Sequence, residues 1–352
     1  MPRFDAQHLL HFGQSVLTAA GASPDIAADT AKYLLEGDLL GYSTHGYKRL
    51  YFNAKLLAEG QARGEGDISV LKQRAAVASW DANFLPGPFV AAKAVRQACD
   101  MARDAGTATI VVRRAQHVAS LAAYLQLATE QGLLISLLCS TPAQASVAPF
   151  GGKAPVFSPN PFAIGVPTSD KPLLLDMSFS MTAAGKIRQY WERQQPLPWQ
   201  AIVRADGQLS SDPADYIEGE GAAILPLGGT DLGYKGYGLC LMSEIWTMSL
   251  SNYGRLDGAS DGESNALFVQ VLDPSAFGET ADFLRVTDDL VARCKACPPL
   301  DSDSPVRIPG ERALANRACQ LQQGVELDDA TWGRLQRAAQ RFSVTPPTPK
   351  DD

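Results

Sequence analysis

The residues best suited to chemistry lie in one short segment, residues 42–49, where His45 is preceded by Thr44 and followed by Gly46. A histidine can give or take a proton near neutral pH. Arg49 follows four positions later, and a guanidinium can bind a carboxylate through two parallel hydrogen bonds. If the segment begins a helix, His45 and Arg49 share one face of it. The segment is therefore suited to hold and protonate a small oxo or hydroxy acid, although a capped helix start with Arg49 in water fits the pattern too.

Two further candidates follow segments that have the composition of buried strands. His117 comes after residues 107–112, and loops at strand ends are where α/β proteins place ligands. A loop histidine that faces water is the alternative. Asp176 ends the apolar run 173–175, and a carboxylate there needs a partner, or its pKa rises. It could orient a histidine, accept a hydrogen bond from a carboxamide, or cap the following turn.

A glycine-rich stretch, residues 225–238, precedes an apolar segment that we expect to be a helix over residues 237–250. Glycine-rich backbone before a helix N-terminus favours an anion, and Lys235 adds a positive charge. The stretch lacks the residue order of a Walker loop, and no GxGxxG follows the early strands. The usual dinucleotide-binding fold is therefore disfavoured.

Helices are expected at both ends of the chain and a sheet between them. Asp5 can cap a first helix, and Ser23 followed by proline can start a second. A third helix is expected from about His45 to Gly60, and the chain is expected to be helical again after residue 279. Strands are expected at residues 75–80, 107–112, 133–138, 162–166, 173–175 and 267–272. Their spacing indicates an α/β sheet that is covered on both faces.

The length of 352 residues exceeds the size at which one core keeps growing, so two domains are expected. Residues 71–280 are the expected sheet domain, which would bind cofactor and substrate. Residues 1–70 and 281–345 are expected to pack together as one discontinuous helical domain. The tail, residues 346–352, is expected to be disordered because it is rich in proline and charge.

Composition excludes several classes of partner. A net charge of -7 argues against non-specific binding to nucleic acid or to anionic membranes. The chain has no run of about eighteen apolar residues, so no membrane span is expected. The N-terminus lacks the layout of a signal peptide and the six cysteines are widely spread, which favours a cytoplasmic location.

Cys294 and Cys297 form a lone CxxC before two prolines, best explained as the last turn of a helix. His8 and His11 lack a third ligand nearby, so no metal site is expected.

Several short motifs, in their order and spacing, resemble the type 2 malate/L-lactate dehydrogenase family. Its members include ureidoglycolate, sulfolactate and 2,3-diketogulonate oxidoreductases and Δ1-piperideine-2-carboxylate reductases. The resemblance runs from about Phe4 to Phe342. The matching motifs are Thr44-His45-Gly46-Tyr47-Lys48-Arg49, Pro149-Phe150-Gly151-Gly152, Ser158-Pro159-Asn160-Pro161, Asp176-Met177-Ser178-Phe179-Ser180, Leu225-Pro226-Leu227-Gly228 with Lys235-Gly236-Tyr237-Gly238, and Pro309-Gly310-Glu311.

The resemblance implies an α/β fold with a non-Rossmann mixed sheet of seven-stranded type, an NAD or NADP cofactor, and a homodimer. It implies that His45 is the proton donor, with Asp176 and His117 beside it as catalytic residues. It implies that Thr44, Arg49 and His117 contact a small carboxylate substrate. The residues that it places along the cofactor are His45, Asn160, Leu175, Asp176, Met177, Ser178, Phe179, Ser180, Met181, Tyr234, Lys235, Gly310 and Glu311.

Two departures from the family pattern lie where a substrate would bind. Thr44 stands where the family has serine, and residues 115–119 lack the serine and glycine that commonly flank His117. We therefore expect an unusual substrate for a reversible hydride transfer at C2 of a 2-oxo acid, 2-hydroxy acid or cyclic 2-imino acid. A cofactor-free lyase or isomerase that uses His45 and Asp176, and a non-catalytic relative with the same fold, are the alternatives. The choice between NAD and NADP stays open.

Overall fold

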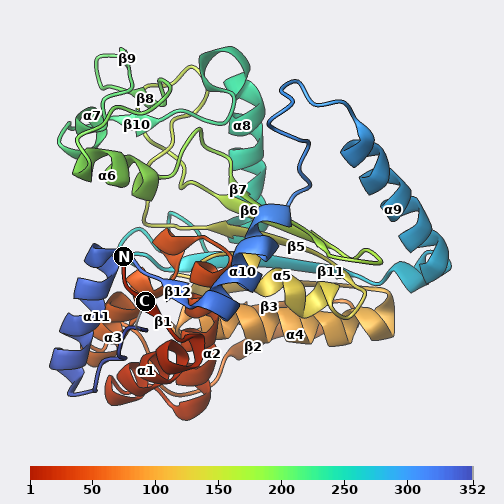
Figure 1. Ribbon diagram of the computed structural model, residues 1–352, viewed down its shortest axis with the longest axis horizontal. Helices are drawn as coiled ribbons and strands as arrows, with labels where there is room; N and C mark the ends of the chain where they lie inside the picture. The colour runs from red at the N-terminus through yellow and green to blue at the C-terminus, as the bar shows by residue number, and fades with distance from the viewer. Residues whose placement is uncertain (351–352) are drawn as a thin grey trace.

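A mixed seven-stranded sheet runs through the middle of the molecule, in a computed structural model that describes residues 1–350 (Figure 1). The strand order is β2-β3-β4-β11-β5-β6-β7. Its strands are β2 (Ser69–Arg74), β3 (Val77–Asp81), β4 (Thr107–Ala115), β5 (Leu134–Ser140), β6 (Pro161–Val166), β7 (Leu173–Ser178) and β11 (Asn265–Leu272). In this sheet β3 and β4 are parallel, and the other neighbouring pairs are antiparallel. The start of β11 therefore lies beside the ends of β4 and β5.

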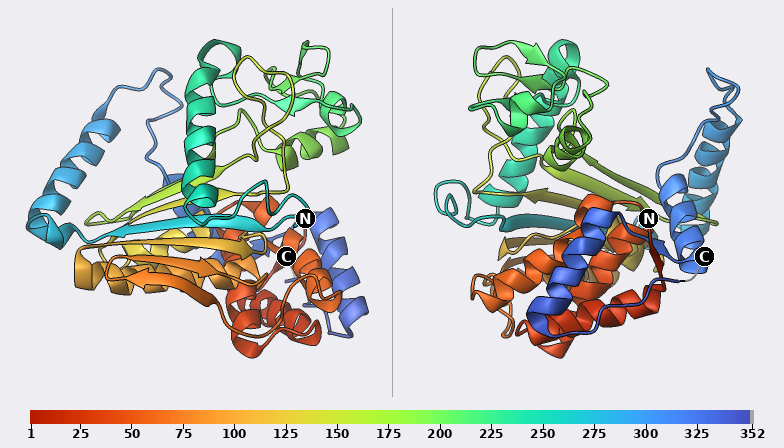
Figure 2. Two further views of the ribbon diagram at one scale, coloured as in Figure 1. Left: turned by 180° about the vertical axis from the view of Figure 1, so that it is seen from behind. Right: turned by 60° about the vertical axis from the view of Figure 1, so that its left-hand side comes forward.

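Helices cover one face of the sheet in two layers. The nearer layer is α4 (Gly87–Ala105) and α5 (Ala122–Thr129), and α2 (Pro24–Leu39) packs on both, with α1 (Ala6–Ala19) behind it (Figure 2). As expected, the helix after Ser23 has proline at its first position. The helix α4 ends at Gly106, whose φ of 78° is readily available to glycine.

The two chain ends lie side by side. β1 (Arg3–Phe4) pairs with β12 (Val325–Glu326), and α11 (Asp329–Phe342) packs on α3 (Leu50–Ala58). Their buried side chains belong to the same hydrophobic cluster as α4, α5 and one face of the sheet. The ends thus share the core of the sheet, and the expected separate helical domain is not confirmed. α9 (Thr280–Ala296) stands away from the N-terminal helices, whereas α10 (Glu311–Gln323) packs on α2 (Figure 2).

A lobe made of one long helix and several short elements covers part of the opposite face of the sheet. Its long helix α8 (Gly229–Glu244) continues into a π-helical segment, η3 (Ile245–Ser249), which contacts the sheet (Figure 1). The other elements are α6 (Ala184–Glu192), α7 (Ala214–Ile217) and a three-stranded sheet of β8 (Ile202–Val203), β9 (Leu209–Ser210) and β10 (Ala223–Ile224). The short sheet was not predicted, because strands of two residues leave no periodic pattern.

Two predicted elements differ from the structure, and an edge strand of the large sheet was missed. The helix expected from His45 is replaced by two 3₁₀ turns, η1 (Ser43–His45) and η2 (Tyr47–Arg49), and α3 begins only at Leu50. The helix expected from residue 237 already begins at Gly229, so most of the glycine-rich stretch lies inside α8. Close packing explains Gly236, because a Cβ on it would overlap the backbone of Leu227. The edge strand β2 was also missed, since all its residues are exposed.

The remaining expectations concern the tail, the CxxC and the membrane. Residues 346–350 form no helix or strand, but the N–H of Lys350 donates to the Arg3 carbonyl at 2.7 Å. Residues 351–352 lie outside the described part of the chain. Cys294 and Cys297 are exposed at the end of α9, as expected. Over residues 1–350, no helix combines the length and the apolar character that crossing a bilayer requires.

Candidate active site

Two histidines from distant parts of the sequence lie face to face. His45 ends η1, and His117 lies in the loop that follows β4. Their ring centroids are 5.6 Å apart and their planes differ by 20°. The Thr44 hydroxyl oxygen is 2.8 Å from Nδ1 of His45. This contact orients the His45 ring and leaves Nε2 as the nitrogen that can exchange a proton with a substrate.

The turn that carries His45 is held from α2. The buried carboxylate of Asp38 accepts a hydrogen bond from the N–H of Tyr47 at 2.6 Å. Gly46 packs directly against this carboxylate, and a Cβ at position 46 would overlap it. Burial raises the pKa of Asp38 to about 7. The glycine after the histidine is therefore required by packing against Asp38.

Arg49 lies between the histidine pair and a carboxylate. Its Nη2 is 3.2 Å from Nε2 of His117, and its Nη1 is 2.6 Å from Oε2 of Glu263. The guanidinium carbon lies 5.5 Å from the centroid of the Phe52 ring. The sequence had suggested that Arg49 and His45 share one helix face. In the structure, two short turns bring them together instead.

Burial and positive charge keep both histidines neutral at pH 7. Burial, followed by the charge of Arg49, lowers the pKa of His45 to about 4. Burial, Arg49 and His45 hold the pKa of His117 well below its usual value. The Ala119 N–H faces Nδ1 of His117 at 3.1 Å, so donors approach both nitrogens of this ring. A neutral imidazole has one acceptor nitrogen, so His117 accepts from one of these donors, and a further proton would remove that acceptor.

Asp176 lies in β7 and caps the start of α5. Its Oδ2 accepts hydrogen bonds from the Ala122 N–H at 2.8 Å and from the Ser120 hydroxyl at 3.2 Å. Within residues 1–350 it has no hydrogen bond to either His45 or His117. Burial raises the pKa of Asp176 to about 6. Three roles were considered for Asp176 from the sequence, and one of them was to cap the following turn. In the structure Asp176 does act as a cap, but for the start of α5.

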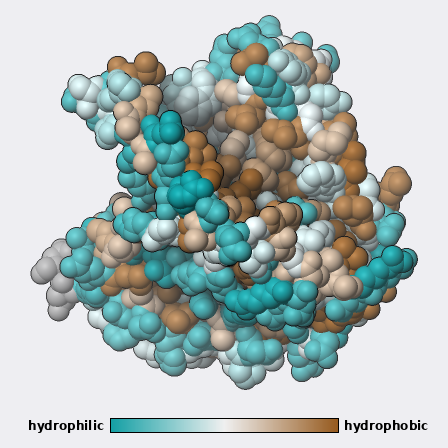
Figure 3. All heavy atoms as spheres, turned by 90° about the vertical axis from the view of Figure 1, so that its right-hand side faces the viewer, coloured by the Kyte–Doolittle hydropathy of each residue, from teal (hydrophilic) through white to brown (hydrophobic). Residues whose placement is uncertain are grey.

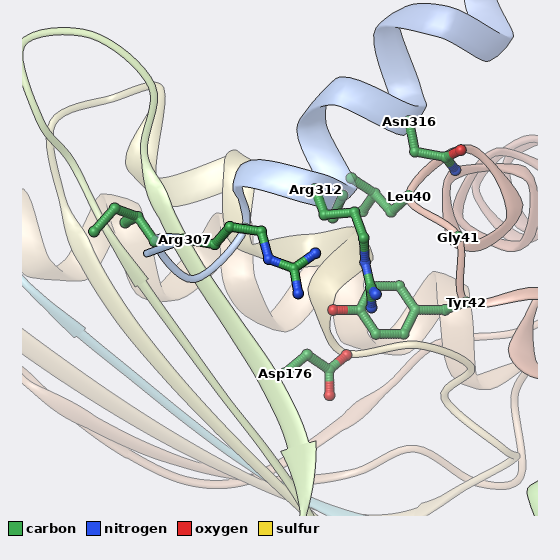
Figure 4. Close-up of a pocket in the computed structure, with 10 residues that line it drawn as sticks. Leu40, Gly41, Tyr42, Asp176, Arg307, Arg312 and Asn316 are labelled. Atoms are coloured by element: carbon green, nitrogen blue, oxygen red, sulfur yellow. The ribbon is translucent and has the colours of Figure 1, made fainter. Parts of the chain in front are cut away.

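A cavity of about 550 Å³ opens beside Asp176. Figure 4 shows the side chains of Arg307, Arg312, Tyr42 and Asp176 converging on it. In the part of the chain that the structure describes, neither arginine has a carboxylate partner. Gly310, at a φ of 90°, begins α10 there, and a Cβ on it would come within 2.7 Å of the backbone of β7. The cavity therefore combines two free guanidiniums with a helix N-terminus, a combination suited to phosphate.

The other residues expected along the cofactor fall into four groups. Asn160 is fully buried, and its amide group donates to the Cys240 carbonyl and to Glu244, each at 3.3 Å. Tyr234 and Lys235 are exposed in α8 and do not line the cavity. The segment Leu175, Asp176, Met177, Ser178, Phe179, Ser180 and Met181 leaves the cavity along β7, with the Ser178 and Ser180 hydroxyl oxygens 3.0 Å apart. Glu311 follows Gly310, but Lys295 engages its carboxylate at 2.8 Å.

Sequence reasoning missed Glu263, Arg307 and Arg312. The two arginines flank the Pro-Gly-Glu motif that was recognised, and their charge beside a helix start was a usable signal. Glu263 had no such local signal. Its place beside Arg49 follows from the position of β11 between β4 and β5.

Comparison with known proteins agrees with this architecture. The family model described as malate/L-lactate dehydrogenase matches residues 4–336. The malate/(S)-sulfolactate dehydrogenase of Methanothermus fervidus is 28% identical over 335 residues, 94% of this chain and 95% of that protein. The solved structure of a putative malate/lactate dehydrogenase from E. coli has a TM-score of 0.90 at 26% identity, covering 98% of this chain and 96% of its own.

A cyclic imine reductase has the same fold. The structure of Δ1-piperideine-2-carboxylate reductase from Pseudomonas syringae has a TM-score of 0.83 at 26% identity, covering 96% of this chain and 100% of its own. The family match spans nearly all of the chain, and the solved structures extend over the same length. The chain therefore belongs to the malate/L-lactate dehydrogenase family and is a dehydrogenase.

Proposed function

We propose that the protein is an NAD- or NADP-dependent oxidoreductase that moves a hydride to or from C2 of a small 2-oxo or 2-hydroxy acid or a cyclic 2-imino acid. The observation that carries this proposal is the neutral His45 imidazole, oriented by Thr44 and placed beside Arg49. The named activities of its relatives, on malate, sulfolactate and a cyclic imine carboxylate, support this substrate range.

The cavity beside Asp176 is suited to the cofactor. Its volume, its two guanidiniums from Arg307 and Arg312 and the N-terminus of α10 fit the phosphates of a dinucleotide. When bound, the nicotinamide ring of NAD(P) would supply the carbon that accepts or donates the hydride. Tyr42 lines this cavity and lies only three residues from His45, which connects the cavity to the proposed proton donor.

Arg49 and His45 divide the work on the substrate. Arg49 would bind the substrate carboxylate and draw negative charge away from C2. This carboxylate would also offset the charge that lowers the pKa of His45, so the pKa would rise when substrate binds. His45 would then take the hydroxyl proton during oxidation and return it during reduction. His117, held neutral between two donors, would position Arg49.

The proposed enzyme acts as a homodimer. Along α8 and η3, Leu239, Met242, Trp246 and Leu250 recur at helical spacing and each is 45% to 52% exposed. Figure 3 shows a hollow with hydrophobic side chains between α9 and the lobe that carries α8. Val286 and Leu290 on α9 are exposed as well. An apolar surface of this kind marks a contact with another protein, and a second copy is the partner that the family resemblance implies.

A substitution at His45 tests the function. His45→Ala is expected to lower kcat by roughly 10²–10⁴-fold, while NADH and NADPH titrations followed by fluorescence give nearly unchanged Kd values. The substrates for the assay come from a screen of 2-oxo acids and cyclic imines against both cofactors. His11→Ala, at an exposed histidine of α1, is the matched control and should keep full activity. Full activity in His45→Ala, or a wild-type protein that binds neither cofactor, would contradict the proposal.

A further inference from the structure

Arg49, the proposed partner of the substrate carboxylate, already has a carboxylate from its own chain. Oε2 of Glu263 lies 2.6 Å from Nη1 of Arg49, and the two side chains are 31% and 24% exposed. Arg49 also points Nη2 at His117. Glu263 therefore stands at the histidine pair, where the substrate would bind, rather than on a distant surface.

The backbone of Glu263 is held by Asn265, which is itself fixed by two further hydrogen bonds. The buried Asn265 donates from its amide group to the Glu263 carbonyl at 3.3 Å and to the Thr141 hydroxyl at 2.9 Å. Its amide oxygen accepts from the N–H of Val118, next to His117, at 2.9 Å. A shift in register between Asn265 and Leu267 marks a β-bulge at this point of β11. Bulges of this kind occur next to active sites, and this one lies two residues after Glu263.

The charges leave no second cation for a substrate. Among residues 1–350, Arg49 is the side-chain cation within hydrogen-bonding distance of the histidine pair. Arg113 and Arg114, at the end of β4, both bind Asp81, at 2.8 Å and 2.6 Å, and Arg307 and Arg312 face the cavity proposed for the cofactor. One substrate carboxylate can share Arg49 with Glu263, because a guanidinium has five donors. A second anionic group close to C2 would meet Glu263 instead of a cation.

The space beside Glu263 suits an uncharged group. A cavity of about 480 Å³ lies there, lined by Phe52, Leu56, Phe84, Gln61 and Gln116 together with the loop that carries Glu263, from which a second carboxylate, Asp261, also lines it. Aromatic and aliphatic side chains with two amides favour an apolar or hydrogen-bonding substrate body over a charged one. The charge of Glu263 and the lining of this cavity thus both disfavour a second anionic group on the substrate.

We infer that Glu263 selects substrates by charge, so that the enzyme favours oxo or imino acids with one carboxylate and discriminates against those with a second anionic group near C2. The inference rests on the proposed function, because it takes Arg49 as the partner of the substrate carboxylate. Discrimination of this kind works by repulsion of the wrong ligand. It separates this protein from relatives whose names specify malate and sulfolactate, both of which are dianions.

Calorimetric titration with two unreactive analogues tests the inference without requiring turnover. Oxamate has one negative charge and tartronate has two, and each is titrated into the protein with NADH and, separately, with NADPH. Glu263→Gln keeps the length of the side chain and an acceptor for Arg49 but removes the charge. We expect it to tighten tartronate binding by about tenfold and oxamate binding by less than about threefold. Glu263→Asp, which keeps the charge, should retain the wild-type preference.

The control is Asp257→Asn, which removes one charge from the same loop at a carboxylate that contacts only the Gly254 N–H among its described neighbours. It should change neither affinity. An equal change for both analogues in Glu263→Gln would mean that Glu263 merely supports Arg49, and would overturn the inference. So would a failure of both analogues to bind to wild type and variant alike. Failure of the proposed function is separate, since it appears as absent turnover of every oxo acid and imine while the calorimetric preference persists.

Discussion

At the scale of single residues, the proposed chemistry depends on a histidine, His45, that is neutral before substrate binds. Burial is the larger cause of the low pKa of His45, and the Arg49 charge is the second. A neutral imidazole beside the Arg49 guanidinium, which keeps donors to spare beside Glu263, is ready to receive an anion, because the anion itself restores the affinity of His45 for a proton. In the proposed mechanism, substrate binding and protonation of His45 are coupled through Arg49.

Replacing Arg49 by methionine tests this coupling. The pKa of His45 should rise from about 4 but stay below its ordinary value of about 6.5, because burial remains when the charge is removed. The KM for the substrate should increase by at least roughly tenfold, since a charged hydrogen bond to the carboxylate is lost. NMR titration of the histidine ring signals gives the pKa, and steady-state kinetics give KM.

Lys48→Met is the control for the change at Arg49, because the charge of Lys48 acts on Asp328 rather than on His45. It should leave both quantities unchanged. A His45 titration midpoint that is the same in wild type and Arg49→Met would show that the guanidinium does not influence the imidazole.

Single residues could be predicted as far as their local pattern extends. His45, Thr44 and Arg49 are close in sequence, so their side chains could be expected together whatever the local structure. His117 could be expected near a ligand because it follows a buried strand. Glu263 is 214 positions from Arg49, and only the strand order joins them. No pattern within residues 250–264 carries that information.

At the scale of elements, the turn of residues 43–49 is set by α2 rather than by its own sequence. Spacing predicted a helix from His45, but Asp38 takes the N–H of Tyr47 and Gly46 interrupts the helical path with ψ at -140°. The buried carboxylate offers a stronger acceptor than a helical carbonyl would. A tertiary contact thus overrides local propensity at the position where the proposed proton donor lies.

Gly46→Ala should disturb this turn. The new methyl group would overlap the Asp38 carboxylate, so the backbone at His45 must move. We expect kcat to fall by roughly 10- to 100-fold, because small misplacements of a catalytic group have large effects. Stability should fall by about 1–3 kcal/mol in denaturant unfolding. Gly333→Ala in α11, where an added methyl has room, should keep kcat and not lower stability; an unchanged kcat in Gly46→Ala would show that the turn tolerates the shift.

Asp38 itself should make stability depend on pH. Its pKa is about 7 in the folded protein and near 3.8 in the unfolded chain, so the folded state binds the extra proton between these values. Its contribution is present below about pH 4 and is lost as the pH rises through 7. The stability of Asp38→Asn relative to wild type should therefore increase from pH 4 to pH 8, by up to roughly 4 kcal/mol. Urea unfolding of both proteins at each pH measures this, and a constant difference would mean that Asp38 is ionised throughout.

At the scale of the whole molecule, the sheet joins two sides with different roles. One face and both chain ends share a single hydrophobic cluster, which gives the histidine pair a rigid support. The opposite face carries the lobe with α8, where a smaller cluster packs on the sheet. Periodicity predicted the strands and long helices, because their buried faces leave a pattern. It could not predict the joining of the ends to the sheet, since strand order and helix docking are set by contacts between distant segments.

The apolar surface of α8 and η3 provides the last prediction. Trp246 is 48% exposed at the middle of the stripe, so Trp246→Glu would place a charge in the centre of the proposed dimer contact. We expect this variant to sediment as a monomer at concentrations where wild type is a dimer. Trp199→Glu is the matched control, because Trp199 is 47% exposed but lies outside α8 and η3, and it should remain dimeric. If Trp246→Glu and wild type sediment alike, the stripe does not form the dimer contact, and the hollow between α8 and α9 requires another explanation.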